Sequence, residues 1–171
     1  MSADPRPFDP EIRTLSHSDL DRIVEIERSA YPFPWSRGIF SDCLRVGYDC
    51  WGLQVRDLLI GYAIQTHGAG ESHLLNLCID PEWQRAGYGS ILLEHAIGHA
   101  TLHGCSSMFL EVRPSNPVAI RLYQGRGFAV VGERRNYYRA EKGRETAIVM
   151  RLDLSREIPG RADLRSCPDP F

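Results

Sequence analysis

The chain has 171 residues, of which 43% are apolar and 25% are charged, as expected for one globular domain. Its formal net charge of −2 lacks the basic excess of most nucleic-acid-binding proteins, which argues against direct nucleic-acid binding. No apolar stretch approaches the ~20 residues of a membrane-spanning helix, and the opening MSADPRPFDP has no apolar run of the signal-peptide kind. We therefore expect a cytoplasmic protein with no membrane partner.

The two ends are expected to lie outside a single domain over residues 11–154. Residues 1–10 are rich in proline and aspartate and predict a flexible segment, whereas residues 155–171 form a polar tail with no apolar period. No internal repeat is visible, and we expect a monomer.

The first half of the domain predicts a strand followed by two helices. After a strand over 12–15, Ser18 fits the N-cap of a helix. The apolar face of that helix consists of residues at helical spacing: Leu20, Ile23, Val24 and Glu27. The prolines within 31–35 must end it, because proline disfavours a helical residue before it, and Ser36 can cap a second short helix.

The rest of the domain predicts strands and helices in alternation. An antiparallel meander covers 50–55, 58–65 and 74–79, with a polar loop over 67–72. A long helix then follows Gly89 and ends at 103–104. The remaining elements are a central strand over 108–112, a short helix over 117–123, and closing strands over 128–131 and 146–152. The order β-α-α-β-β-β-α-β-α-β-β predicts an α/β fold with one mixed sheet and helices on both faces.

The cysteines and histidines do not indicate a metal site. The 5 cysteines form no Cys-x-x-Cys pair, so we expect free, mostly buried thiols in a reducing compartment. His95, His99 and His103 are spaced four apart and would share one helix face. Without a carboxylate in register or a closed ligand set, we interpret them as a partly solvated face and expect no bound metal.

The most specific local pattern is the turn Gln84-Arg85-Ala86-Gly87-Tyr88-Gly89, between a strand end and the long helix. Glycines allow positive φ and a close approach of the backbone to a ligand. The helix start offers unpaired N–H groups and a partial positive charge, and Arg85 adds a cation. These features predict a pyrophosphate site, although an ordinary strand–helix turn could also require two glycines.

In its context this turn resembles the Gln/Arg-x-x-Gly-x-Gly/Ala signature of the GNAT acetyltransferases. The resemblance implies a mostly antiparallel sheet that splays between the fourth and fifth strands, with acetyl-CoA as co-substrate. The residues whose backbone would hold its pyrophosphate are Arg85, Ala86, Gly87, Tyr88, Gly89 and Ser90. In the preceding strand, Leu77, Cys78 and Ile79 would hydrogen-bond the pantetheine arm, and one of their N–H groups would polarise the thioester carbonyl.

Further segments resemble the RimI branch of this family. Residues 110–123 carry Leu-Glu-Val-Arg, then an Asn, then Ala-Ile-Arg-Leu-Tyr, and Gly127-Phe128 completes the pattern. Residues 134–138 (RRNYY) and 31–36 (YPFPWS) separate this branch from other GNAT proteins. The resemblance covers residues 12 to 152 or so. It implies acetylation of a protein N-terminal α-amine, with the N-terminal alanine of a small-subunit ribosomal protein as the leading substrate.

The candidate catalytic residues each have a structural alternative. Glu111 lies in an apolar strand, where a carboxylate is costly to bury, and we interpret it as the general base rather than as a salt-bridge partner of Arg113 or another arginine. The family role of Tyr123 is the general acid that protonates the leaving thiolate, although it could be a core aromatic. Asn116 is implied to contact the cofactor arm and can also cap a helix. No neighbouring base activates Cys78, so we interpret it as a packing residue.

The aromatic residues of the RimI-like segments are candidates for the acceptor groove. Tyr31, Phe33 and Trp35 could form one wall or belong to the core. Tyr137 and Tyr138 are expected in a strand-end loop, with one facing the groove and the other packing, because adjacent strand residues point to opposite faces. Two other functions remain open: acetylation of lysines or small-molecule amines, and a non-catalytic CoA-binding module.

Overall fold

A computed structural model describes residues 9–155 and contains the predicted order of strands and helices around one sheet. The strands are β1 Pro10–Thr14, β2 Asp49–Val55, β3 Leu58–Gly68, β4 Glu71–Ile79, β5 Ser107–Val112, β6 Ala129–Arg139 and β7 Arg144–Asp153. The α-helices are α1 Leu20–Ala30, α2 Arg37–Val46, α3 Tyr88–Leu102 and α4 Pro117–Gly125, and short 3₁₀ helices cover His17–Asp19 and Pro81–Trp83. The segment predicted to be flexible ends earlier than expected, since β1 already includes Pro10; residues 1–8 and 156–171 lie outside the described part.

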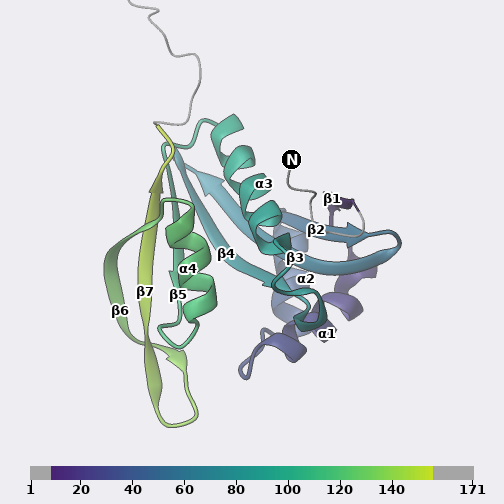
Figure 1. Ribbon diagram of the computed structural model, residues 1–171, viewed down its shortest axis with the longest axis horizontal. Helices are drawn as coiled ribbons and strands as arrows, with labels where there is room; N and C mark the ends of the chain where they lie inside the picture. The colour runs from purple at the N-terminus through teal and green to yellow at the C-terminus, as the bar shows by residue number, and fades with distance from the viewer. Residues whose placement is uncertain (1–8, 156–171) are drawn as a thin grey trace, which may run out of the picture.

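The sheet has the order β1-β2-β3-β4-β5-β7-β6 and is antiparallel except between β4 and β5. These two strands pair only from Glu71↔Ser107 to Leu74↔Leu110. Beyond Leu74, β4 continues to Ile79 beside β3 alone, while β5 continues beside β7. Figure 1 shows the two strands diverging from this short paired region. The predicted splay between the fourth and fifth strands is therefore confirmed.

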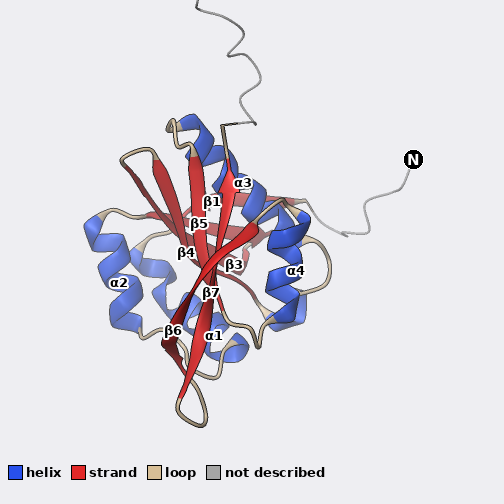
Figure 2. Ribbon diagram, turned by 90° about the vertical axis from the view of Figure 1, so that its left-hand side faces the viewer, coloured by secondary structure: helices blue, strands red, loops and turns tan. Residues whose placement is uncertain are grey.

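Helices cover both faces of the sheet and form two apolar cores. One core contains the buried faces of α1 and α2, with Ile23 and Phe40 among its members. The other contains the face of α3 with Leu92 and Leu93, together with Tyr123 of α4. Figure 2 shows α2 and α4 on opposite sides of the strands. Each fully buried Leu or Ile contributes about 1.5–3 kcal/mol to folding, so these faces fix the helices on the sheet.

The structure corrects two of the predicted element boundaries. Ser18 does not cap α1: the backbone N–H of Ser16 donates to the Asp19 carboxylate (2.9 Å), and a 3₁₀ turn precedes Leu20. The predicted 67–72 loop is a tight hairpin, because Ala69 and Gly70 both have positive φ (51° and 79°) and the flanking strands extend to them. Two consecutive positive φ values match the twist of the strands, which allows the shorter connection.

The described cysteines Cys43, Cys50, Cys78 and Cys105 are free and buried, as expected. Within residues 9–155, no helix combines the length and apolar character that crossing a membrane requires.

Gly61 of β3 holds the strand that carries the predicted thioester contacts close to its neighbour. A Cβ at this position would lie 2.5 Å from Ile79 Cδ1 and 2.8 Å from the Cys78 carbonyl oxygen. We expect Gly61→Ala to lower the free energy of unfolding by about 1–3 kcal/mol, as overpacking does in cores. The matched control is Gly98→Ala on the exposed side of α3, where the added Cβ meets nothing within 4 Å and removing a helical glycine should stabilise by up to about 1 kcal/mol. Urea denaturation measures both, and equal midpoints would contradict the packing argument.

Candidate active site

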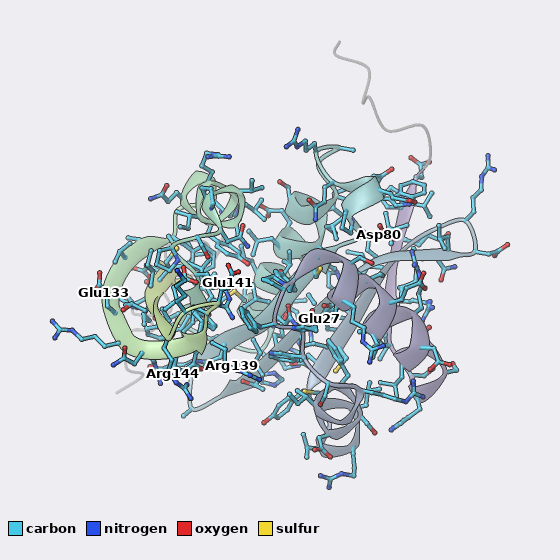
Figure 3. The ribbon with its side chains drawn as sticks, turned by 90° about the horizontal axis from the view of Figure 1, so that it is seen from below. Glu27, Asp80, Glu133, Arg139, Glu141 and Arg144 are labelled. Carbon is cyan, nitrogen blue, oxygen red and sulfur yellow. The ribbon has the colours of Figure 1, made fainter. Side chains whose placement is uncertain are left out.

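The divergence of β4 and β5 creates a cleft of about 270 Å³. Its walls come from α1, the α1–α2 connection, β4, β5, α4 and β6. The predicted site residues that line it are Tyr31, Phe33, Trp35, Leu77, Glu111, Asn116, Tyr123, Tyr137 and Tyr138. Cys78, Ile79 and the turn 85–90 do not line this cleft. In the view from below (Figure 3), Glu27 lies on the α1 side and Arg139 on the β6 side.

Tyr123 is carried on α4 and is only 7% exposed. Its ring packs edge-on against Phe128, with 5.7 Å between ring centroids, so it belongs to the core and to the cleft lining at once. Burial raises the pKa of Tyr123 well above its ordinary value. The phenol is therefore protonated at neutral pH, which is the form a general acid needs.

Glu111 lies on β5, and its side chain is 23% exposed to the cleft. Its Oε1 is 2.7 Å from Nε of Arg134. Because β7 lies between β5 and β6, this ion pair reaches across a strand. Arg113, the neighbour considered from sequence, instead pairs with Glu145 at 3.2 Å. Glu111 thus faces the cleft and is also a salt-bridge partner, with Arg134 in place of Arg113, while its role as general base stays a prediction.

Tyr137 and Tyr138 differ from expectation in two ways. They lie within β6 rather than in a strand-end loop, and both line the cleft, with their rings 4.9 Å apart. The reason is a register shift between Arg134 and Tyr138, where Asn136 has a φ of 52°. A bulge of this kind interrupts the alternation of side chains along a strand. Hydrogen bonding to the Glu111 carboxylate raises the pKa of Tyr137, and burial raises that of Tyr138.

Two arginines that the sequence analysis did not assign to the groove also line the cleft. The Arg113 guanidinium lies 4.3 Å from the centroid of the Tyr138 ring, and Arg113 and Arg139 both lie within 6 Å of the Phe33 ring. Cations over aromatic faces are held in a defined position. The side of the cleft formed by Phe33 and the β6 tyrosines is therefore aromatic and carries positive charge near Glu111.

The aromatic wall is fixed by Glu27, a buried residue that the sequence analysis also missed as a site residue. Its carboxylate accepts hydrogen bonds from the Trp35 backbone N–H (2.8 Å), the Asn76 side chain (3.2 Å) and the Tyr62 hydroxyl. The Tyr31 hydroxyl donates to the Leu77 carbonyl at 3.1 Å. The sequence did contain an indication of this role. Glu27 lies at the helical spacing of the apolar residues of α1, and a carboxylate on a buried helix face requires hydrogen-bond partners.

The glycine turn ends directly at α3. Gly87 is the N-cap with a φ of 83°, and Arg85 also has positive φ (64°). A glycine cap has no side chain that could accept from the first-turn N–H groups, which suits an external anion such as a pyrophosphate. The Gln84 side chain donates a hydrogen bond to the Ile79 carbonyl (2.9 Å), and Arg22 forms a 2.6 Å salt bridge with Asp80. These contacts attach the turn to β4 and to α1.

Two further candidates have clear local environments. The Asn116 side chain accepts a hydrogen bond from the Ala119 N–H at 3.2 Å and also lines the cleft, so it caps α4 and faces the cleft at once. Burial raises the pKa of the Cys78 thiol to about 12. A thiol of that pKa is uncharged at neutral pH, which fits packing rather than nucleophilic attack.

This chain belongs to the GNAT acetyltransferases: residues 20–128 match the model of the Acetyltransferase (GNAT) family. It is therefore an acetyltransferase, and enzymes of this fold use acetyl-CoA.

Within the family, the chain is similar to enzymes that modify a ribosomal protein. The [Ribosomal protein bS18]-alanine N-acetyltransferase of Escherichia coli strain K12 is 39% identical over 144 residues, covering 84% of this chain and 97% of that protein. The corresponding Salmonella typhimurium enzyme is 40% identical over the same length and with the same coverage. The crystal structure of the ribosomal-protein-S18-alanine N-acetyltransferase from Escherichia coli matches with a TM-score of 0.80 at 38% identity, covering 85% of this chain and 94% of that one. The resemblance predicted from the sequence motifs is confirmed.

Proposed function

We propose that this protein transfers the acetyl group of acetyl-CoA to the N-terminal alanine of ribosomal protein bS18. The observation that carries the proposal is the similarity to two enzymes named for this reaction, which extends over 84% of the chain. We further propose that it acts in the cytoplasm as a monomer, without direct contact to nucleic acid.

The residues of the cleft suit a direct transfer in a ternary complex. Acetyl-CoA supplies an activated acetyl group as a thioester, held by backbone N–H groups of residues 85–90 and by β4. The peptide amine enters from the side of Tyr31, Phe33 and the β6 tyrosines. The β4 backbone beyond Leu74 has no β5 partner, so a backbone N–H among residues 77–79 is the candidate donor to the developing oxyanion.

Proton transfers through Glu111 and Tyr123 complete the proposed reaction. Glu111, directly or through water, takes a proton from the substrate ammonium, and the freed amine attacks the thioester carbonyl. Tyr123, neutral because burial raises its pKa, gives its proton to the departing thiolate. The attacking nitrogen loses its second proton to water as the thiolate leaves, and Glu111 releases the proton that it took to solvent. The Tyr123 phenolate is then reprotonated from solvent, so the enzyme returns to its starting state.

Mass spectrometry of peptides incubated with protein and acetyl-CoA tests the substrate. The panel contains a bS18-type peptide with a free N-terminal alanine, the same peptide N-terminally blocked with an internal lysine, and simple polyamines. Direct mass detection avoids the background that 5 cysteines would give with a thiol-reactive dye. We expect one acetyl group on the free N-terminus alone. Acetylation of the blocked peptide or of the polyamines would show that the substrate is a lysine side chain or a small-molecule amine instead. If no amine were acetylated, the protein would be a non-catalytic CoA-binding module.

A further inference from the structure

A cluster of three histidines and one aspartate lies where β2, β3 and the C-terminal half of α3 meet. The histidine cluster consists of Asp49, His67, His99 and His103. Asp49 begins β2, and His67 lies near the end of β3. His99 is in the last turn of α3, and His103 is the C-cap that follows Leu102. The expectation of a solvated histidine face rested on the lack of a carboxylate in register. The fold supplies that carboxylate from a strand fifty residues earlier in the chain.

The ligand atoms of Asp49, His67 and His99 are close enough to share one ion. Asp49 Oδ2 lies 2.7 Å from His67 Nδ1 and 3.2 Å from His99 Nε2. These three atoms all lie within 4.8 Å of one another. In a tetrahedral zinc site with bonds of about 2.0–2.2 Å, neighbouring ligand atoms are about 3.3 Å apart. The observed spacings require only small side-chain movements to reach that geometry.

His103 lies beside the three residues whose ligand atoms are within 4.8 Å of one another, and a movement of its side chain would bring its Nε2 to the ion as a fourth ligand. Its Nδ1 lies 2.9 Å from the His99 carbonyl oxygen, which can only accept, so Nδ1 carries the proton and Nε2 keeps its lone pair. A hydrogen bond from one ring nitrogen to a backbone carbonyl is the usual way in which a metal-binding histidine is oriented. The His103 ring centroid lies 4.1 Å from that of His99 and 4.4 Å from that of His67.

The environment of His99 gives an independent reason to expect a ligand. Its Nε2 is buried and has no hydrogen bond within residues 9–155, although it lies 3.2 Å from Asp49 Oδ2. A buried polar atom left without a partner is costly, and a metal bond would satisfy it. Among residues 9–155, the Trp51 ring and His95 pack beside the cluster, and the thiols of Cys50 and Cys105 lie near Asp49. None of these groups brings a negative charge, because burial raises the pKa of both thiols.

We propose that Asp49, His67, His99 and His103 bind a divalent transition-metal ion, with Zn²⁺ as the best match to three imidazoles and one carboxylate. The ion is structural rather than catalytic, because His99 lies 11 residues along α3 from Tyr88, about 16 Å at 1.5 Å per residue. It would join β2, β3 and α3, and so hold the helix whose other end forms the glycine turn. The ion takes no part in the acetyl transfer itself. Metal binding and acetylation can therefore be tested by separate measurements.

Titration of the metal-free full-length protein with Zn²⁺ tests the proposal. After treatment with a chelator, calorimetry should show one Zn²⁺ per chain, and the melting temperature should rise by about 5 °C or more at a hundredfold excess over Kd. Co²⁺ in place of Zn²⁺ should give the visible absorption of a tetrahedral site. No binding, or a melting temperature that is unchanged by Zn²⁺, would overturn the proposal.

Matched variants show whether the ion occupies this cluster. His67→Asn and Asp49→Asn should weaken Zn²⁺ binding at least 100-fold, whereas His17→Asn, an exposed histidine elsewhere, should bind as the unaltered protein does. His103→Asn removes an exposed ligand and serves if Asp49→Asn fails to fold; it should abolish the tetrahedral Co²⁺ spectrum. Unaltered Zn²⁺ binding by the cluster variants would assign the ion to other surface groups and reject the site.

Discussion

Tyr123→Phe is expected to lower kcat by about 10² to 10⁴-fold, the usual contribution of a positioned general acid. The substitution removes only the hydroxyl, and the ring can keep its edge-on contact with Phe128 at 5.7 Å. The affinity for acetyl-CoA should therefore stay close to that of the unaltered protein. Steady-state kinetics with the bS18-type peptide, together with calorimetric titration of acetyl-CoA, separate the two quantities.

Tyr48→Phe is the matched control for this experiment. Tyr48 is 42% exposed and does not line the cleft, so loss of its hydroxyl should leave kcat unchanged. If Tyr123→Phe kept full turnover while binding acetyl-CoA normally, the assignment of Tyr123 as the general acid would be wrong, and its place in the core would be its whole role.

Glu111→Gln is expected to lower kcat/KM by about 10²-fold or more at pH 7 and by much less at pH 9.5. A protein α-amine has a pKa of about 7.7–8.0, so at pH 7 most substrate molecules carry the proton that a base must remove. At pH 9.5 almost all of them are already neutral, and the base has less to contribute. The measurement is the pH dependence of kcat/KM for both proteins on the same free-alanine peptide.

The salt bridge to Arg134 provides the control that separates catalysis from structure. Arg134→Gln removes the 2.7 Å ion pair but leaves the carboxylate in the cleft. The Arg134 side chain is 60% exposed, and such pairs contribute only about 0.2–1 kcal/mol, so this variant should lose less than tenfold at every pH. Equal, pH-independent losses in both variants would show that Glu111 matters only as an ion-pair partner.

Local features of this protein could be predicted from its sequence. The Ser36 cap, the Asn116 cap and the positive φ of Gly87 depend on hydrogen bonds and dihedral angles within a few residues. The alternation of apolar patterns likewise specified the order of strands and helices, and the motifs placed Glu111 and Tyr123 in one site. Even here, the sequence did not distinguish between neighbouring residues of similar capping ability. Ser16 and Asp19 form the cap that was expected at Ser18.

The partners of the site residues were decided only by the tertiary structure. Glu111 pairs with Arg134 and not with nearby Arg113, because β7 enters between β5 and β6 and sets their register. Both β6 tyrosines reach the cleft because a bulge at Asn136 changes the side-chain alternation, and a single positive φ in a strand has no periodic signature.

The histidine cluster is the clearest case of partners that the sequence alone does not predict. The spacing of His99 and His103 along one helix was visible in the sequence, but Asp49 and His67 join them only through the pairing of β2 with β3 and the packing of α3 over both. Sequence periodicity reports which face of an element is buried. Which distant side chain meets that face depends on strand order and register, and these are properties of the whole fold.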